Sequence, residues 1–232
     1  MNLFNIMLSA IYPNRCVVCG EIIPEGESLC EFCSEFIEVC DTSKLCIKCG
    51  SMKKNCYCNK RSFYYDGLVA PFLNEENARK VVYSFKLNRK ERYCRFLAER
   101  MAVTVKQCYD VDFDYVTYVP MKISTVFSRG FNQSYLLAKE LSKNLGVPLG
   151  YKFLKCVKSN KPQHELSGKE RFDNVKGLYS APDLPAGVKI LLVDDIKTTG
   201  ATLNECAKEL YKAGAGSVYC VAALLSEKKK GK

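Results

Sequence analysis

The sequence predicts an α/β protein whose mainly parallel sheet is flanked by helices, with a small cysteine-rich module in front. Strand and helix patterns alternate through the second half of the chain, as in parallel α/β domains. Two of these strands, VKILLV and SVYCVAALL, are continuous apolar runs, which is typical of strands buried on both faces. Nine of the 14 cysteines lie within residues 16–58. We therefore predict a small module in residues 1–60 and a larger domain in residues 61–232.

The composition is that of a globular protein that carries excess positive charge. Hydrophobic residues make up 47% and charged residues 26%, and no apolar run approaches the roughly 18 residues of a membrane span. The opening segment MNLFNIMLSAIYP lacks a basic n-region and a cleavage site. We therefore expect an amphipathic helix there, not a signal peptide, and a cytoplasmic location. The formal charge of +10 favours an anionic substrate or a polyanionic partner.

The cysteines of the N-terminal module form four closely spaced pairs. Because the cytosol keeps thiols reduced, this regular spacing indicates metal binding and not disulfides. Four pairs supply two tetrahedral Cys₄ zinc sites, as in a double zinc ribbon. We choose pairing in sequence order, although the spacing leaves other pairings open, and Cys40 has no assigned role. The predicted zinc ligands are Cys16, Cys19, Cys30, Cys33, Cys46, Cys49, Cys56 and Cys58.

Between the module and the alternating region, the sequence predicts one hairpin and two helices. Asp66-Gly67 is typical of a two-residue hairpin turn between short strands. Asn74 is a suitable cap for a helix that buries an apolar face. A second helix is expected from Glu91 to Cys108. The two buried faces consist of Ala78, Val81, Val82 and Phe85, and of Tyr93, Phe96, Leu97, Met101 and Val105.

The alternating region predicts four strands and two helices. DYVTYVP is the first strand, and Asn132 to Leu145 the first helix, ended by Gly146. LGYKFLKCV is predicted as the next strand, followed by a polar stretch from Ser159 to Gly187 with little periodicity. VKILLV, a helix from Ala201 to Ala213 and SVYCVAALL complete the domain.

The segment ILLVDDIKTTGATL, residues 190–203, carries the most informative site pattern. Asp194 and Asp195 follow a buried strand, and ligands of open parallel sheets bind at the carboxyl ends of strands. The loop leads into a helix N-terminus, whose unpaired N–H groups and dipole favour a phosphate. Gly200 allows close backbone approach and the threonines supply hydroxyl donors. The segment therefore predicts a site for a sugar with vicinal hydroxyls and a 5′-phosphate. G-x-x-x-x-G-K-[ST] and G-x-G-x-x-G patterns are absent from the sequence.

This segment resembles the phosphoribosyl pyrophosphate loop of type I phosphoribosyltransferases. With YVPMKISTVFSRGFNQS, KPQHELSGKERFDNVKGLY and the cysteine-rich N-terminus, the chain resembles the ComF family of competence proteins over nearly its whole length. The resemblance implies a phosphoribosyltransferase-like fold behind a double zinc ribbon. It also implies phosphoribosyl pyrophosphate or a related ribose 5-phosphate ligand, with Mg²⁺ beside Zn²⁺ as cofactor. The resemblance further implies a role in natural competence, DNA uptake and single-stranded DNA handling, with competence machinery proteins as partners.

The resemblance also assigns roles to individual residues. It implies catalytic roles for Asp194, Asp195, Arg129, Gln163 and Arg171, of which the two aspartates would hold the ribose hydroxyls. It places the 5′-phosphate and pyrophosphate on Thr198, Thr199, Gly200, Ala201, Thr202, Pro120, Met121, Lys122 and Gly130. Ser159–Lys176 corresponds to a mobile loop that closes over the site, and the length of the whole polar stretch from Ser159 to Gly187 suits a lid or a disordered surface loop.

Two functions of different class stay open on the sequence. The first is an Mg²⁺-dependent phosphoribosyltransferase whose acceptor no motif identifies. The second is a non-catalytic, zinc-dependent nucleic-acid-binding factor that uses the pocket as a ligand sensor. Lysines interleave with Tyr57, Phe63, Tyr64 and Tyr65, which suits stacking on single strands. The junction between module and domain is the other expected use of these aromatic residues.

Overall fold

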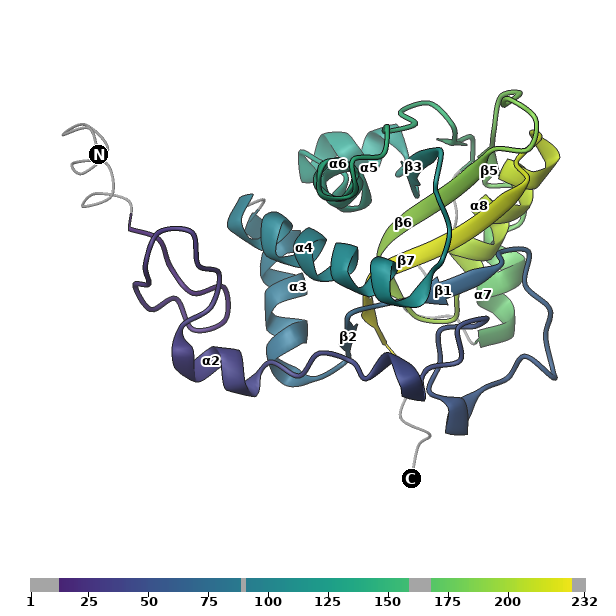
Figure 1. The fold of residues 1–232 in the computed structure, drawn as a ribbon. Coiled ribbons are helices and arrows are strands. Elements are labelled where there is room, and N and C mark those ends of the chain that lie inside the picture. The colour runs from purple at the N-terminus through teal and green to yellow at the C-terminus, as the bar shows by residue number, and fades with distance from the viewer. Residues whose placement is uncertain (1–12, 89–90, 159–167, 227–232) are drawn as a thin grey trace.

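A computed structural model describes residues 13–88, 91–158 and 168–226 (Figure 1). Its central sheet is entirely parallel, with strand order β1-β7-β6-β3, and β2 also pairs with β7. These strands are β1 (Gly67–Val69), β2 (Phe72–Leu73), β3 (Tyr115–Tyr118), β6 (Lys189–Lys197) and β7 (Ser217–Leu225). A separate antiparallel pair consists of β4 (Lys155–Cys156) and β5 (Tyr179–Ser180). The predicted α/β class with a parallel sheet is confirmed.

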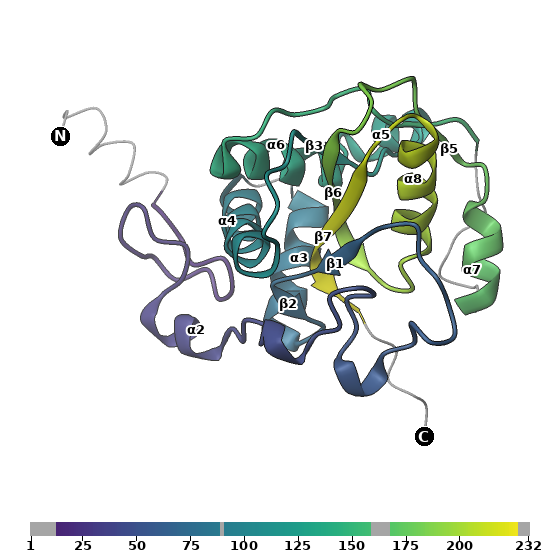
Figure 2. The same ribbon diagram turned by 45° about the vertical axis from the view of Figure 1, so that its right-hand side comes forward.

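Helices cover both faces of the sheet, as Figure 2 shows. On one face lie α3 (Glu76–Asn88), α4 (Glu91–Cys108) and α6 (Gln133–Leu145), which share a core with Leu191 and Val193. On the other lie α7 (Gly168–Val175) and α8 (Ala201–Lys212), whose core includes Ile190 and Leu192. Successive residues of β6 thus point into two different cores, which explains its continuous apolar sequence. None of the described helices is long and apolar enough to cross a membrane.

The helix predictions are confirmed with close boundaries. α4 has the expected bounds, and the predicted apolar faces of α3 and α4 are buried. Asn132 caps α6 by accepting a hydrogen bond from the Tyr135 amide at 3.2 Å, and Gly146 ends it at φ +70°. α8 begins at the expected Ala201. α3 begins at Glu76, two residues after the predicted cap Asn74.

The predicted hairpin at Asp66-Gly67 is wrong. Gly67 opens β1, which runs parallel to β7. The Asp66 carboxylate accepts hydrogen bonds from the Tyr211 hydroxyl and from the Val218 amide. Its own amide donates to the Val218 carbonyl at 2.7 Å. Contacts with residues more than 140 positions away override the local turn preference of an Asp-Gly pair.

Three further boundaries differ from the prediction. Of LGYKFLKCV only β4 is a strand, while Leu149 forms a single parallel bridge with Val116. The polar stretch is not structureless, because it contains α7 and β5. β6 continues past Val193 to Lys197, since β7 runs beside it as far as Leu225. The two acids therefore lie within the paired part of the strand and not beyond it.

The N-terminal module forms two lobes that dock at different places. The first lobe includes α2 (Glu31–Phe36) and packs beside α3 (Figure 1), where Asn77 donates to the Phe36 carbonyl. The second lobe carries short 3-10 helices η1 (Thr42–Lys44) and η2 (Lys53–Asn55). It pairs with β1 where the Leu68 amide donates to the Ile47 carbonyl at 2.7 Å. The predicted boundary after residue 60 stays a prediction, and the expected N-terminal amphipathic helix lies outside the described residues.

Candidate functional site

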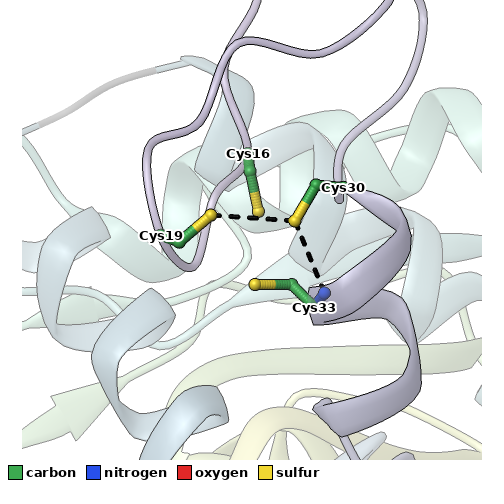
Figure 3. Close-up of side chains that lie close together, drawn as sticks. All are labelled: Cys16, Cys19, Cys30 and Cys33. Carbon is green, nitrogen blue, oxygen red and sulfur yellow. Dashed lines mark hydrogen bonds between the residues drawn. The ribbon is translucent and has the colours of Figure 1, made fainter.

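The eight predicted cysteine ligands form two clusters, paired in sequence order as expected. One cluster is Cys16, Cys19, Cys30 and Cys33, which Figure 3 shows converging, and the other is Cys46, Cys49, Cys56 and Cys58. Within each cluster the sulfur atoms lie within 4.8 Å of one another. Two of these sulfur–sulfur distances are 3.7 Å, for Cys19–Cys30, and 3.8 Å, for Cys46–Cys58. A tetrahedron with Zn–S bonds of about 2.3 Å has edges of about 3.8 Å, so both clusters fit a Cys₄ zinc site.

One thiol in each cluster ionises near neutral pH. Burial opposes ionisation of Cys16, but hydrogen bonds from backbone amides, including those of Cys19 and Cys30, lower its pKa to about 6. Burial likewise opposes ionisation of Cys46, and the Cys49 amide and the neighbouring thiols lower its pKa to about 7. Zinc binds thiolates, so an easily ionised sulfur in each cluster favours metal binding. Cys40, outside both clusters, is buried against Leu45 and Ala70 and contributes to a small core.

We expect two zinc ions per chain by elemental analysis. Both clusters have the ligand number and sulfur spacing of structural sites, and such lobes fold on the metal. Cys33→Ser should reduce the content to one ion, because it removes a buried ligand of the first cluster only. A folded parent protein that contains no zinc after purification without chelators would contradict the prediction.

In the larger domain, Asp194 and Asp195 lie side by side near the carboxyl end of β6. The Ser134 hydroxyl, from the first turn of α6, donates to the Asp194 carboxylate at 2.9 Å. The amide of Asp195 donates to the same oxygen at 2.9 Å. Lys86 of α3 forms an ion pair with the Asp195 carboxylate at 2.9 Å. Two helices thus hold the acid pair in place, one through a hydroxyl and one through a cation.

The surroundings of Asp194 shift its pKa. Burial, followed by repulsion from Asp195, raises the pKa of Asp194 to about 7. The Ser134 hydroxyl, the Asp195 amide and Lys86 oppose this rise without cancelling it. Asp194 therefore gains or loses its proton near neutral pH, where a neighbouring ligand or cation shifts its charge.

The raised pKa of Asp194 predicts a pH effect on stability. The unfolded state loses the proton near the ordinary value of 3.8, and the folded state keeps it up to about pH 7. Protonated Asp194 therefore contributes to the free energy of unfolding fully below about pH 4, and this contribution is lost as pH rises to about 7. Asp194→Asn should flatten this part of the profile, measured by urea denaturation between about pH 5 and about pH 8. The exposed Asp110→Asn variant should keep the parent's slope, and equal slopes for all three proteins would contradict the prediction.

The loop after β6 has the predicted geometry of a helix entry. Gly200 precedes α8 in the left-handed region, at φ +79°. The Thr199 hydroxyl accepts a hydrogen bond from the Ala201 amide at 3.3 Å. Thr198 is exposed, Thr199 and Thr202 are half-buried, and Gly200 and Ala201 are buried. The loop thus presents two threonine side chains and a helix N-terminus next to the acid pair in sequence.

The remaining predicted residues come from three other segments. Lys122 is the exposed residue before α5 (Ile123–Arg129), and Gly130 ends that helix at φ +81°. Arg129 is the last residue of α5, and its side chain is outside the described part. Arg171 lies half-buried on α7, while Gln163 falls in residues 159–167, outside the described ranges.

The expected mobile loop is in part a packed helix. α7 is held because the Gly177 amide donates to Glu205 of α8 at 2.8 Å. In addition, the Arg61 guanidinium lies 3.7 Å over the Phe172 ring. The lid prediction therefore stays a prediction only for residues 159–167, which the structure does not describe. The sequence interpretation missed α7 because the helix has only eight residues and most of them are polar.

Four residues near the site were missed by the sequence interpretation. Ser134 of α6 and Lys86 of α3 contact the acids. Asn132, the cap of α6, donates to the carbonyl of Val119, the residue after β3, at 3.1 Å. Lys197, the fourth, is 2% exposed. Its position between Ile196 and Thr198 gave no sign that this lysine would be buried. The run Asn132-Gln133-Ser134 offered a signal, since polar residues beginning a helix at the end of a strand often serve a site.

Two family profiles match this chain. The phosphoribosyl transferase domain matches residues 132–232, and the double zinc ribbon domain matches residues 7–61. Competence protein F of Haemophilus influenzae is 29% identical, over 94% of this chain and 96% of its own length. The DNA utilization protein YhgH of Escherichia coli is 26% identical, over 92% of this chain and 98% of its own. A solved structure, glutamine phosphoribosylpyrophosphate amidotransferase from B. subtilis, is 23% identical over 56% of this chain and 25% of its own, with a TM-score of 0.38.

A parallel sheet with an acid pair ahead of a helix-entry loop, behind two Cys₄ lobes, defines a phosphoribosyltransferase-domain protein with a double zinc ribbon. The two matched segments occur here in the same order as the sequence resemblance implied. The chain combines these two domains and is similar over nearly its whole length to competence protein F of Haemophilus influenzae.

Proposed function

We propose that the carboxyl end of β6 and the N-terminus of α8 bind phosphoribosyl pyrophosphate. The observation that supports this most is the acid pair, anchored by Ser134 and Lys86, directly before the loop of residues 198–200. The carboxylates accept hydrogen bonds from the ribose hydroxyls. The N–H groups of the loop and of the helix N-terminus donate hydrogen bonds to the 5′-phosphate. When the sugar binds, its hydroxyls share Asp195 with Lys86, whose side chain is about one quarter exposed and so has room to move.

The same site suits transfer of the phosphoribosyl group. The bond between C1′ and the pyrophosphate oxygen breaks, a bond to the acceptor's nucleophilic atom forms, and the acceptor loses its proton. Positive charge develops on the sugar ring, and Asp194 and Asp195 stabilise it electrostatically. Lys122, Arg129 and Gly130 of the α5 segment are proposed to contact the pyrophosphate, and Gln163 and Arg171 are proposed to act at the same site.

Mg²⁺ is part of this proposal. The oxygen atoms of Asp194 and Asp195 are the hard ligands that this ion prefers, so the donor set fits it. When bound with the pyrophosphate, Mg²⁺ neutralises charge on the leaving group. The protein's own part is to position the sugar and to exclude water, for which residues 159–167 are the proposed lid.

Isothermal titration with phosphoribosyl pyrophosphate, with and without Mg²⁺, tests binding. We expect one site per chain and tighter binding with the ion. A pyrophosphate-release screen over nucleobases and nucleotides then tests turnover and identifies the acceptor. Binding without release for every acceptor would support the ligand-sensor alternative, and absence of binding would exclude both functions of the pocket.

The names of two relatives, competence protein F and DNA utilization protein YhgH, support a role in DNA uptake. We propose that this role takes place in the cytoplasm, with competence machinery proteins as partners. Single-stranded DNA is the second candidate ligand. The second zinc lobe carries five exposed lysines close together in sequence, with Tyr64 half exposed beside them. Such a surface grips the phosphate backbone and offers one ring for stacking. The lysines are Lys44, Lys48, Lys53, Lys54 and Lys60.

Affinity for a single-stranded oligonucleotide should therefore fall steeply with salt. Each lysine that neutralises a phosphate releases condensed counterions, with a log–log slope of about −0.7 per contact. Replacing Lys53 and Lys54 by Gln should reduce the steepness by about one to two contacts, measured by fluorescence anisotropy at several salt concentrations. Lys212→Gln on α8 is the control, because it makes the same Lys-to-Gln change outside the second zinc lobe and should keep the parent's salt dependence. Absence of binding at low salt would assign the positive charge to the phosphoribosyl ligand instead.

A further inference from the structure

A buried lysine connects β6 to the second zinc lobe. Lys197 is the last residue of β6 and is only 2% exposed. Its ammonium donates to the Ser51 hydroxyl at 3.0 Å and lies 5.5 Å from the centre of the Tyr57 ring. Ser51 follows the ligand Cys49 by two residues, and Tyr57 stands between the ligands Cys56 and Cys58. The cation therefore contacts two residues that lie within two positions of ligands of the second Cys₄ cluster.

A buried ammonium is stabilised by nearby negative charge. Four thiolates around one divalent zinc ion carry a net charge of minus two, and Lys197 contacts Ser51 and Tyr57, which neighbour ligands of that cluster in sequence. A loaded centre would therefore interact favourably with the ammonium, and the lysine would in turn favour the anionic, metal-bound form of the cluster.

The same lobe also contacts the loop of residues 198–200. The Tyr57 hydroxyl donates to the Thr199 carbonyl at 3.3 Å. Tyr65 is fully buried, and its hydroxyl would lie 3.0 Å from a Cβ at Gly200. The Phe63 ring stacks on Tyr65, with ring centroids 4.9 Å apart. On the following helix, Asn204 accepts a hydrogen bond from the Tyr64 amide at 2.8 Å. The back of the loop is therefore formed by the lobe that carries the second cluster and by the segment that follows it.

We propose that the second Cys₄ centre positions the phosphate loop of residues 198–200, with Tyr57 and Lys197 as the connecting residues. The inference rests on the proposed phosphate-binding role of that loop. Metal at the centre holds Cys56, Tyr57 and Cys58 in one conformation, and Tyr57 in turn holds Thr199. Two ligands that stabilise the same conformation are coupled, and the coupling is reciprocal. Zinc retention and phosphate-ligand affinity should thus rise and fall together.

The first centre is the natural comparison. Its lobe packs through Val17 and Ile37 into the core on the α3 and α4 side, whereas the loop packs with the second lobe on the α8 side. Loss of the first zinc should therefore leave residues 198–204 unaffected. The two centres are alike in their ligands and differ in what they contact, so the chain contains its own control.

The first experiment needs no phosphate ligand. Amide hydrogen exchange of the segment 198–204 is compared in the zinc-loaded parent, Lys197→Met and Tyr57→Phe. The first variant removes the charge but keeps an apolar chain of similar length, and the second removes one hydroxyl. We expect faster exchange in this segment in both variants, and parent-like exchange in Lys44→Met, an exposed lysine of the same lobe. Unchanged exchange in both variants would overturn the proposal, and if Lys197→Met does not fold, Tyr57→Phe decides.

The second experiment measures the coupling. Chelator competition should release the second zinc from Lys197→Met at least about fivefold faster than from the parent, with the first zinc unchanged. Ribose 5-phosphate should bind both variants about tenfold more weakly than it binds the parent. Parent-like zinc release together with parent-like affinity contradicts the coupling. If the parent itself binds neither ribose 5-phosphate nor phosphoribosyl pyrophosphate, the proposed function fails, while exchange and zinc release still decide the role of Lys197 and Tyr57.

Discussion

Changing both Asp194 and Asp195 to Asn should weaken phosphoribosyl pyrophosphate binding by at least about tenfold. The change keeps the size of each side chain but removes two anions from the site. A hydrogen bond to a charged acceptor contributes about 1.5–3 kcal/mol, and a loss of about 1.4 kcal/mol is tenfold in affinity. Isothermal titration in the presence of Mg²⁺ gives the affinity directly.

Two features of the structure sharpen this experiment. Asp110→Asn with Asp112→Asn is the matched control, because it removes the same two charges from exposed positions and should bind as the parent does. The stability of the site variant should not fall, since burial and repulsion between the acids already disfavour the ionised form of Asp194. A stable site variant that binds with parental affinity would show that the acids do not contact the sugar.

The change of Gly200 to Ala should distort the phosphate loop and lower both affinity and stability. Its φ of +79° is a left-handed conformation, which costs a residue with a Cβ about 1–2 kcal/mol. The added Cβ would lie 3.0 Å from the Tyr65 hydroxyl, so the buried ring or the loop must also shift. We expect the free energy of unfolding, measured by urea denaturation, to fall by about 2 kcal/mol or more and ligand affinity to fall with it.

Gly146→Ala separates the two causes. Gly146 has a similar φ of +70° at the end of α6, but nothing lies within 4 Å of its added Cβ, so only the backbone cost applies. Tyr65→Phe should partly rescue Gly200→Ala, because it removes the oxygen in the way. That hydroxyl is buried without a hydrogen-bond partner among the described residues, so its loss carries little cost of its own. Equal destabilisation by the two alanine variants, without rescue by Tyr65→Phe, would show that the contact with the tyrosine hydroxyl is unimportant.

Features set by interactions between residues close in sequence were predicted correctly, and features set by contacts between distant residues were not. α4, α6 and α8 were predicted within about one residue because apolar periodicity and capping residues such as Asn132 and Gly146 act locally. Both Cys₄ clusters were predicted for the same reason, since two closely spaced thiols fix each half of a site. The hairpin at Asp66 was wrong because distant partners decided that backbone, and of the predicted strand before Val157 only Lys155–Cys156 forms, paired with β5.

By itself, the sequence determined the α/β class, the four closely spaced cysteine pairs, and the position of the acid pair before a helix-entry loop, whereas the structure decided which cysteine pairs share a cluster. These depend on spacing and on polarity along the chain, which any strand or turn must follow. Only the tertiary structure brought Ser134 and Lys86 to the acids and Lys197 beside the second cluster. Those contacts join residues about 60 to 150 positions apart, and their geometry depends on how helices pack on a sheet, which no local pattern encodes.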